Sequence, residues 1–480
     1  MDRTGDVTRR QLLGTTLAAG AAGLAYSASP ALAQNAPVAG TAGSLPDRGE
    51  FVIRGAYVIT MDPNLGDIPN GDIHVRNGAI VAVGPNLVAP GAEVIDARTM
   101  IVIPGMIETH WHMWGTAARN MAGDDEKTGY FPYSRVLGKV FTAEDNARGV
   151  RIGLAEALNG GLTTVNNWSH NLLGPDYADA ELQAHRDLGS RALFSYGYSR
   201  KTGANQTLPL DDVARVQKQW FNGGDGLLTL GIASRGPENN TVDICQKEWE
   251  TARKLGIRIT CHMGTDPQRV EKRQGIQVLL KAGLLGPDVL LVHDTNTNDR
   301  DLEVLAKTKT PVSLSPFTEL RTGFGFTPIL EMLNADVPVS LSVDTALLCG
   351  NADMFAIMKA MLNIGDGSAR SEFGLAARRV LQMATIDGAV ALGIANKVGS
   401  LTPGKRADIV VIRTNDLNMA PFTNPVHMVV QSAQPSNVEY VSVDGRMLKR
   451  GGKLVAVDVP KLVGDVNETM TRVMAEVAKG

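Results

Sequence analysis

Short apolar runs separated by segments of helical periodicity dominate the middle of this chain. Eight runs have strand composition, and most are followed by a stretch with apolar residues at helical spacing. They cover residues 101–112, 162–168, 192–198, 228–234, 257–263, 289–294, 311–316 and 338–344. Strands that alternate with helices in this number are typical of a (β/α)8 TIM barrel, so the pattern predicts an α/β protein with a barrel over residues 100–396. A doubly wound open sheet is less favoured, since no Gly-rich phosphate loop follows an early strand.

Helix boundary signals support the same organisation. Thr142-Ala143-Glu144-Asp145 resembles a capping box before an apolar-periodic stretch at 147–158. Residues 242–255 are amphipathic and end at Gly256, a common residue after a helix. Residues 461–480 are predicted to contain a terminal helix over 463–478.

Two β-rich stretches flank the predicted barrel, at residues 34–99 and 397–460. Apolar and polar positions alternate in parts of both, and Asn77-Gly78 and Asp444-Gly445 are typical hairpin-turn dipeptides. Neither stretch has enough strands to build a good core alone. We therefore expect the two flanks to combine into one small β-sandwich.

The first 33 residues resemble a bacterial twin-arginine export signal. Arg9-Arg10 is followed by a small apolar stretch at 12–25 and by Ala31-Leu32-Ala33, an A-x-A-like cleavage site. A transmembrane anchor is the weaker alternative, because the stretch is short and rich in Gly and Ala. We expect a periplasmic or secreted protein without a membrane segment after cleavage.

Composition narrows the class of partner. The 480-residue chain is 44% hydrophobic, which suits a substantial core, and its formal net charge is -3. Without a dense Lys/Arg run it has no electrostatic footprint for nucleic acid or anionic membrane, so we expect a small-molecule substrate; a homo-oligomer stays open. The three cysteines form no CxxC pair and are most simply core thiols.

The predicted barrel strands end in metal-binding residue types. His110 and His112 close the first strand, His262 the fifth, His293 the sixth and Asp344 the eighth. Histidines at i and i+2 of a strand point to the same face, and catalytic groups of such barrels lie at the C-terminal strand ends. Three imidazole nitrogens and one carboxylate oxygen suit zinc or ferrous iron.

These residues also carry a family resemblance. Residues 104–112 (PGMIETHWH), the later His262, His293 and Asp344, and residues 398–410 (VGSLTPGKRADIV) resemble the amidohydrolase superfamily. Within it the chain is most similar to the cytosine deaminase and chlorohydrolase-like branch. The resemblance covers nearly the whole mature chain.

The resemblance implies a role for each residue. His110, His112, His262 and Asp344 would hold one divalent metal ion, zinc ahead of iron. His293 would polarise the substrate or bond the attacking water, and Asp344 would move the proton of that water to the leaving group. Dinuclear members use a carboxylated lysine on an early strand, and the second and fourth predicted strands have no lysine. We therefore expect a mononuclear site.

One position departs from the family pattern. Deaminases of this branch usually carry Glu three residues after the strand-five histidine, and Thr265 stands there. Asp266, Glu238 or Glu319 are candidates to deliver a proton instead, although a solvated loop residue is the favoured interpretation of each. The reaction would need no such acid if it were amide hydrolysis or displacement of a good leaving group.

Aromatic residues after the first two strands are candidates for the substrate pocket. Trp111, Trp114, Trp168 and His170 lie close together in sequence, and aromatic walls suit a planar ring. Trp111 should point away from its histidine neighbours and pack behind the site. His170, Trp114, Glu238 and Glu319 are our candidate substrate-binding residues, residues 235–238 a substrate-facing loop, and residues 115–141 a candidate lid.

Three functions follow. The leading hypothesis is a metal-dependent hydrolase of a non-peptide C–N bond, in an amide, amidine or aminated ring. The second keeps the site and displaces a halide from a heteroaromatic ring. The third is an exported metal or ligand binder without catalysis, which the retention of both His293 and Asp344 disfavours, since a binder needs no base beside the water.

Overall fold

In the computed structural model, residues 44–203, 205–223 and 226–477 are described. The expected export signal lies outside these ranges. Within them, none of the helices combines the length and apolar character needed to cross a membrane.

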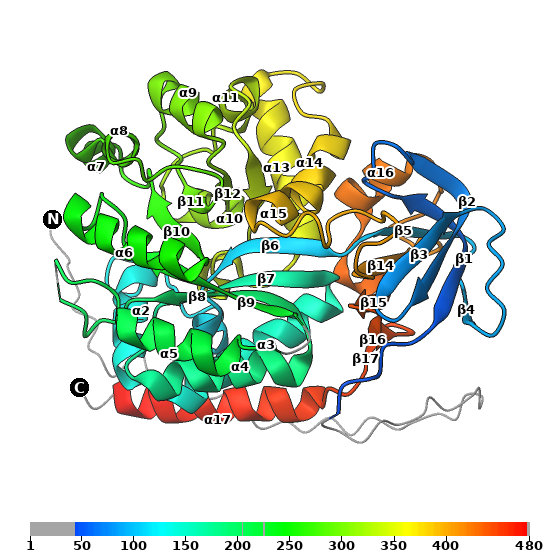
Figure 1. The fold of residues 1–480 in the computed structure, drawn as a ribbon, viewed down its shortest axis with the longest axis horizontal. Helices are drawn as coiled ribbons and strands as arrows, with labels where there is room; N and C mark the ends of the chain where they lie inside the picture. The colour runs from blue at the N-terminus through cyan, green and yellow to red at the C-terminus, as the bar shows by residue number, and fades with distance from the viewer. Residues whose placement is uncertain (1–43, 204, 224–225, 478–480) are drawn as a thin grey trace, which may run out of the picture. The chain divides into compact units, whose positions relative to one another are not determined.

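The centre of the molecule is an eight-stranded parallel barrel (Figure 1). Its strands are β6 (Met106–Trp111), β7 (Leu162–Ser169), β8 (Arg191–Gly197), β9 (Leu228–Ser234), β10 (Arg258–Met263), β11 (Val289–His293), β12 (Val312–Leu314) and β13 (Val339–Leu341). Neighbouring strands pair in sequence order, and a parallel bridge between Trp111 and Asp344 joins the last strand region to the first. The predicted barrel is confirmed.

One predicted strand is wrong in extent. The run at 101–112 is two strands, because β5 (Met100–Pro104) ends before Gly105 and joins the flanking sheet, where it pairs with β14 (Ile409–Arg413). A Cβ at Gly105 would lie 2.1 Å from Oγ1 of Thr163. Only glycine therefore fits where the chain passes from one sheet to the other.

Helices connect the barrel strands. They include α2 (Tyr130–Val140), α3 (Ala143–Asn159), α4 (Pro175–Leu188), α5 (Leu210–Trp220), α6 (Val242–Leu255), α7 (Pro267–Arg273), α8 (Gly275–Lys281), α9 (Asp299–Thr308), α10 (Pro316–Arg321), α11 (Ile329–Asn334), α12 (Ala346–Cys349) and α13 (Met354–Ala369). The predicted capping box of Thr142 and Asp145 is present at the start of α3. Helix α6 ends as expected at Gly256, whose φ of 68° is left-handed.

The flanks combine as predicted, into a nine-stranded mixed sheet. Besides β5 and β14 it contains β1 (Phe51–Ile59), β2 (Asp67–Arg76), β3 (Ala79–Gly84), β4 (Glu93–Asp96), β15 (Val438–Val443), β16 (Arg446–Arg450) and β17 (Lys453–Leu454). The strands enclose their own apolar core, with Ile53 and Val75 from the N-terminal flank against Ile409 and Met447 from the C-terminal flank. Both predicted turn dipeptides have the left-handed φ values that such turns require.

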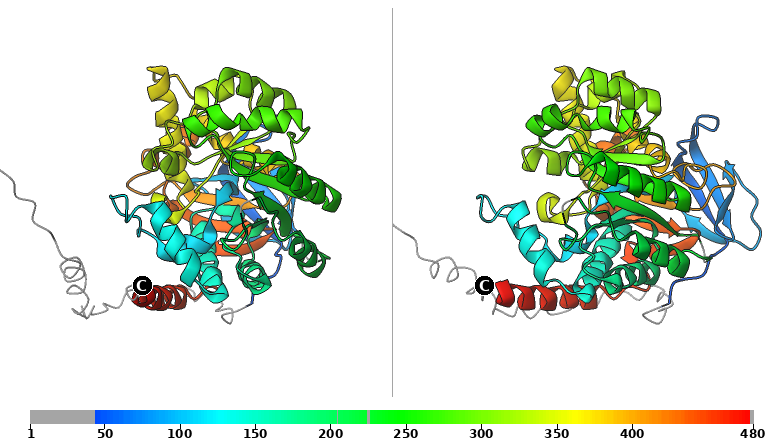
Figure 2. Two further views of the ribbon diagram at one scale, coloured as in Figure 1. Left: turned by 90° about the vertical axis from the view of Figure 1, so that its left-hand side faces the viewer. Right: turned by 60° about the vertical axis from the view of Figure 1, so that its left-hand side comes forward.

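Further elements complete the chain after the barrel. They are α14 (Ala377–Met383), α15 (Ile386–Ala391), α16 (Pro425–His427), the short helices η2 (Met428–Ser432) and η3 (Pro435–Asn437), and α17 (Val459–Val477); η1 (Met113–Ala118) follows β6. Helix α17 is the predicted terminal helix and begins slightly earlier, at Val459. It lies along α3 (Figure 2), where Thr469 donates a hydrogen bond to Asp145 at 3.0 Å.

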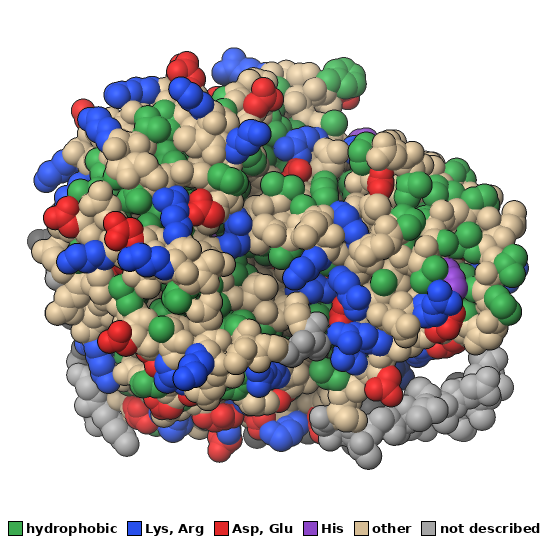
Figure 3. Space-filling view, viewed as in Figure 1, with side chains coloured by type: hydrophobic (Ala, Val, Ile, Leu, Met, Phe, Trp, Pro, Cys, Tyr) green, Lys and Arg blue, Asp and Glu red, His purple; other side chains and the backbone are tan. Residues whose placement is uncertain are grey.

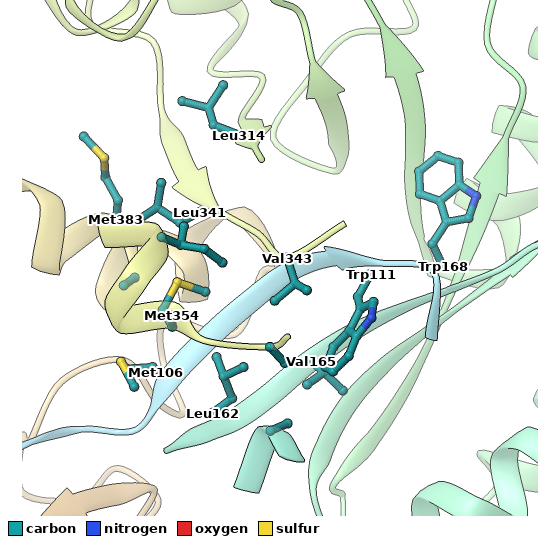
Figure 4. Close-up of a cluster of buried hydrophobic side chains, with 14 of the residues drawn as sticks. Met106, Trp111, Leu162, Val165, Trp168, Leu314, Leu341, Val343, Met354 and Met383 are labelled. Atoms are coloured by element: carbon teal, nitrogen blue, oxygen red, sulfur yellow. The ribbon is translucent and has the colours of Figure 1, made fainter. Parts of the chain in front are cut away.

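The barrel core packs immediately beneath the predicted site. Trp111 is fully buried among apolar side chains, near Val165, Val343 and Met354 (Figure 4). The prediction that this indole packs behind the site is confirmed. On the face seen in Figure 3, Lys and Arg side chains are interspersed with Asp and Glu.

Candidate active site

Four histidines and one aspartate meet at the C-terminal end of the barrel. Nε2 of His110 lies 3.2 Å from Nε2 of His262 and 3.3 Å from Oδ1 of Asp344. Nε2 of His112 lies 3.3 Å from the same Oδ1. Nε2 of His293 is 3.8 Å from the other carboxylate oxygen. The strand ends therefore converge as the sequence predicts.

The spacing of these atoms fits a tetrahedral metal ion. Ligand atoms about 2.0–2.1 Å from zinc are separated by about 3.3 Å along the edges of a tetrahedron. The three distances among His110, His112, His262 and Asp344 given above have this length. All three distances run from Nε2 atoms of the histidines, so these atoms face the common centre, while the buried Nδ1 atoms of His110 and His112 have no hydrogen-bond partner among the described residues. These four residues could hold one divalent ion.

The backbone of Asp344 fixes the site to the first strand. Its N–H donates to the carbonyl oxygen of His110 at 2.8 Å, and its own carbonyl accepts from the N–H of His112 at 2.6 Å. Asp344 has φ of 63° and His293 has φ of 75°, a region that non-glycine residues rarely adopt. Strained backbone of this kind persists where surrounding structure holds it and is frequent at functional sites.

Burial sets the charge state of the imidazoles. It lowers the pKa of His110, His112 and His262 well below the usual value, with the neighbouring histidines adding to the shift. The neutral imidazole is the form that ligates metals. The fold therefore holds these side chains ready for a cation.

Glu319 supports His293 and does not line the cavity. This corrects the expectation of a substrate contact, because α10 begins directly after β12 and directs the side chain into the barrel wall. Its Oε1 accepts from the backbone N–H of Ser315 at 2.7 Å and lies 3.2 Å from Nδ1 of His293. Burial opposes the charged form of His293, but the bond to Glu319 and the charge of Asp344 outweigh it and raise the pKa of His293. Glu319 therefore orients the imidazole.

Two other predicted substrate residues also lie behind the cavity wall. Glu238 is buried and accepts the N–H of Gly264 at 3.1 Å, so it braces the loop after β10. Trp114 packs with Phe141 and donates from Nε1 to Nδ1 of His170 at 3.3 Å. Neither side chain lines the cavity, which corrects both expectations.

His170 is the predicted substrate residue that does line the cavity. Its ring centroid lies 4.4 Å from that of His112 in an edge-to-face arrangement. Burial, with the charge of Arg200, lowers its pKa to about 4. Because Nδ1 accepts the indole N–H of Trp114, the neutral ring carries its proton on Nε2.

Glu108 is a supporting residue that the sequence reasoning missed. Its buried carboxylate accepts the backbone N–H groups of His110 at 2.6 Å, Val343 at 3.2 Å and Asn166 at 3.3 Å. It thereby ties β6 to both of its neighbours. Its position two residues before His110, hence on the same face of the strand, is the signal that could have found it.

A cavity of about 810 Å³ opens above the five residues. Its lining comes from the loops and helices that follow the strands: Tyr130, Phe131, Ser134, His170, Tyr198, Ser199, Arg200, Arg235, Thr265, Asp266, Pro267, Arg269, Thr318, Thr322, Gly323 and Phe324, beside His112, His262, His293 and Asp344. The volume suits a small organic ligand. Helix α2, inside the predicted lid segment, contributes Tyr130 and Phe131.

Apart from His170, the aromatic wall is made by residues other than the predicted ones. Trp168 is buried beneath the site, its ring centroid 4.2 Å from that of His262, and it does not line the cavity. Tyr130, Phe131, Tyr198 and Phe324 line it instead. They lie in irregular loops or at helix starts, where periodicity gives no direction for a side chain.

Few carboxylates are available in the cavity for proton transfer. Thr265, which stands where the family resemblance led us to expect Glu, lines it. Oδ1 of Asp266 accepts the N–H groups of Gln268 at 2.9 Å and Arg269 at 3.1 Å and so caps α7. Among the described lining residues, Asp344 is therefore the carboxylate that remains free to act beside the four histidines.

Comparison with known proteins gives relatives over almost the whole length. The chain is 30% identical over 446 residues to a 5′-deoxyadenosine deaminase of Methanosarcina barkeri, covering 89% of this chain and 100% of the relative. A 5-methylthioadenosine/S-adenosylhomocysteine deaminase of Symbiobacterium thermophilum is also 30% identical, over 89% of this chain and 99% of its own.

Solved structures share the fold. An adenosine deaminase from Xanthomonas campestris with bound zinc superposes with a TM-score of 0.82 at 23% identity, covering 90% of this chain and 100% of that one. Atrazine chlorohydrolase from Arthrobacter aurescens, complexed with zinc, gives a TM-score of 0.80 at 23% identity, with 87% and 99% covered. The amidohydrolase family model matches residues 101–448. Because that match spans more than two thirds of the sequence, the chain belongs to the amidohydrolase family, a family of metal-dependent hydrolases.

Proposed function

We propose that this protein hydrolyses a non-peptide C–N bond of a small cyclic or aromatic substrate, using one divalent metal ion, with zinc ahead of iron. The observation that carries the proposal is the set of four ligand atoms at tetrahedral spacing, with His293 beside them at the floor of a large cavity. The deaminase activity named for the two relatives above supports a C–N bond as the target.

His110, His112, His262 and Asp344 would hold the ion. When bound, such an ion supplies Lewis acidity that lowers the pKa of a coordinated water. Oδ2 of Asp344, turned toward His293, accepts the proton of the attacking water and passes it to the departing nitrogen. The two backbone hydrogen bonds of Asp344 hold the carboxylate still while it does so.

His293 lies beside the Asp344 carboxylate and acts on the substrate. Its Nδ1 faces Glu319, so Nε2 faces the cavity and Asp344. A proton held at Nε2 donates a hydrogen bond to the substrate atom that gains negative charge as the water attacks. Glu319 keeps the ring in this orientation from behind.

Thr265 bears on the choice of substrate. With a hydroxyl where the related deaminases usually carry a carboxylic acid, the cavity offers no obvious group to protonate a ring nitrogen. This favours amides, amidines and rings whose leaving group departs without such help. The same observation favours displacement of a halide from a heteroaromatic ring as the second candidate function.

Three arginines favour a substrate that carries negative charge. Arg200, Arg235 and Arg269 line the cavity, and their hydrogen bonds go to the hydroxyl of Ser134, to backbone carbonyls and to the amide of Asn239. The charges of Glu238 and Glu248 act on Arg269 and Arg235, whereas no carboxylate among the described residues contributes to the electrostatics of Arg200. A guanidinium group without a carboxylate partner is a good anion ligand.

The test is a substrate panel with the metal-loaded and the metal-stripped protein. Cyclic amides, amidines, aminopurine nucleosides and halogenated triazines are incubated with each, and ammonia, amine or halide release is measured. We expect C–N cleavage by the loaded protein, lost on stripping and restored by zinc. Halide release alone would favour the second function, and metal binding without turnover of any compound would favour a binder.

A further inference from the structure

One side of the cavity is aromatic from the metal-ligand cluster to the solvent. The ring of Phe324 lies 5.4 Å from that of His293. Phe131 follows at 6.5 Å from Phe324, and Tyr130 at 5.2 Å from Phe131. Helix α2 and the loop after α10, far apart in the sequence, therefore meet across the cavity mouth.

The outer end of this wall is exposed to an unusual degree. Phe131 retains 51% of its accessible surface although it lines the cavity. Exposed aromatic side chains grouped at a pocket mouth are typical of a binding surface, since burying them against a ligand is favourable.

Hydrogen bonds hold the loop that carries Phe324 in a fixed position. The carbonyl oxygen of Phe324 accepts from Nδ2 of Asn296 at 3.0 Å and from Oγ1 of Thr295 at 3.3 Å. Arg321 donates to the carbonyl of Ala122 at 3.1 Å, which joins the loop to the segment before α2. Phe131 and Phe324 are thus a preformed surface.

We propose that Phe131 and Phe324 form a subsite for an apolar, preferably aromatic, group of the substrate that is remote from the bond that breaks. The inference rests on the proposed function and extends it, because it assigns a binding place to the part of the substrate that does not react. A cavity of about 810 Å³ is much larger than a single reacting ring needs. A substrate whose ring lies at Asp344 and whose appendage reaches the mouth would cover the exposed face of Phe131.

The test compares two compounds with the same amino-bearing ring, 5′-deoxyadenosine and its 5′-benzylthio derivative, on wild type and Phe131→Ala. Ammonia release gives kcat/KM, and calorimetry gives affinity whether or not a compound is hydrolysed. We expect the benzylthio compound to bind about tenfold more tightly than 5′-deoxyadenosine and to lose most of that advantage in Phe131→Ala. Phe131→Tyr should keep it, and so should Phe373→Ala, which removes an exposed phenylalanine outside the cavity lining.

The outcomes separate this inference from the proposed function. Tighter binding that depends on Phe131, without turnover of either compound, supports the subsite and counts against adenine deamination. Binding of the benzylthio compound no tighter than that of 5′-deoxyadenosine overturns the subsite, whatever the turnover. An equal effect of Phe131→Ala on both compounds overturns it as well.

Discussion

The backbone N–H of Asp344 donates a hydrogen bond to the carbonyl oxygen of His110 at 2.8 Å, at the seam that closes the barrel. The proposed reacting carboxylate and the first proposed metal ligand are therefore held by main chain, independently of the Asp344 side chain. A change confined to that carboxylate should leave the fold intact, so a loss of activity reports on the two roles proposed for it, metal ligand and proton acceptor.

We predict that Asp344→Asn lowers kcat by about a thousandfold or more, since an amide cannot accept the proton of the attacking water. The circular dichroism spectrum and Tm should stay close to those of wild type. Asp266→Asn, at a cavity-lining carboxylate that caps α7, is the matched control and should keep most activity. Full turnover by Asp344→Asn would contradict the assigned role.

A second prediction concerns Glu319. Glu319→Gln weakens the support of His293 without changing any proposed ligand, so we expect kcat to fall about 10- to 100-fold while KM and metal content hardly change. Steady-state kinetics and elemental analysis on the same preparation measure both. Glu331→Gln, an exposed carboxylate in α11, should change neither value. A loss of metal in Glu319→Gln would contradict the proposal that Glu319 supports His293 without helping to hold the ion.

The buried Glu181, which lies outside the candidate site, should make the free energy of unfolding depend on pH. It is buried in α4, where it accepts from Asn146 and Asn167, both at 2.9 Å, and burial raises its pKa from 4.5 to about 7. The folded state therefore holds the proton more tightly than the unfolded chain. The free energy of unfolding should fall as pH rises from about 4.5 to about 7, by up to about 3 kcal/mol from this group.

Glu181→Gln removes that dependence, because glutamine does not ionise. Urea unfolding of metal-free protein at pH 5 and pH 8 should show the variant gaining stability relative to wild type as pH rises. The exposed Glu372→Gln should give a constant difference at both values. A Glu181→Gln difference that is equally constant would mean that Glu181 does not titrate in this window.

Export is a proposal that the twin arginine, the apolar stretch after it and the A-x-A-like cleavage site support. Replacing Arg9 and Arg10 with lysine should leave the protein in the cytoplasm, while the native sequence is recovered from the periplasm with Gln34 as its first residue. Cell fractionation and N-terminal sequencing measure this. Native protein found in the cytoplasm with its N-terminus intact would contradict the proposal.

Regular periodicity explains how much of the fold could be predicted. Strands such as β10 and β11 are largely buried and stand out as short, mainly apolar runs, so the histidines at their ends can be placed together from sequence. The split at Gly105 was missed because β5 and β6 read as one run. Its cause, the approach of Thr163, is a contact between distant residues.

The cavity was harder to predict than the strand ends. Side chains in a strand alternate, so His110 and His112 could be assigned to one face from sequence. Glu238 lies in an irregular segment after β9 and Glu319 lies in α10, and the direction of each side chain depends on where the helix after its strand begins. Phe131 and Phe324 are also hard to predict from sequence, because their rings come into contact only in the tertiary fold.

The central claim is that four residues hold one metal ion on which hydrolysis depends. Stepwise addition of zinc to metal-free protein, with turnover of the best substrate measured at each step, tests it most directly. We predict that activity rises linearly and saturates at one ion per chain, and that His262→Ala shows no such rise. Saturation at two ions per chain, or full activity before any zinc is added, would contradict the account.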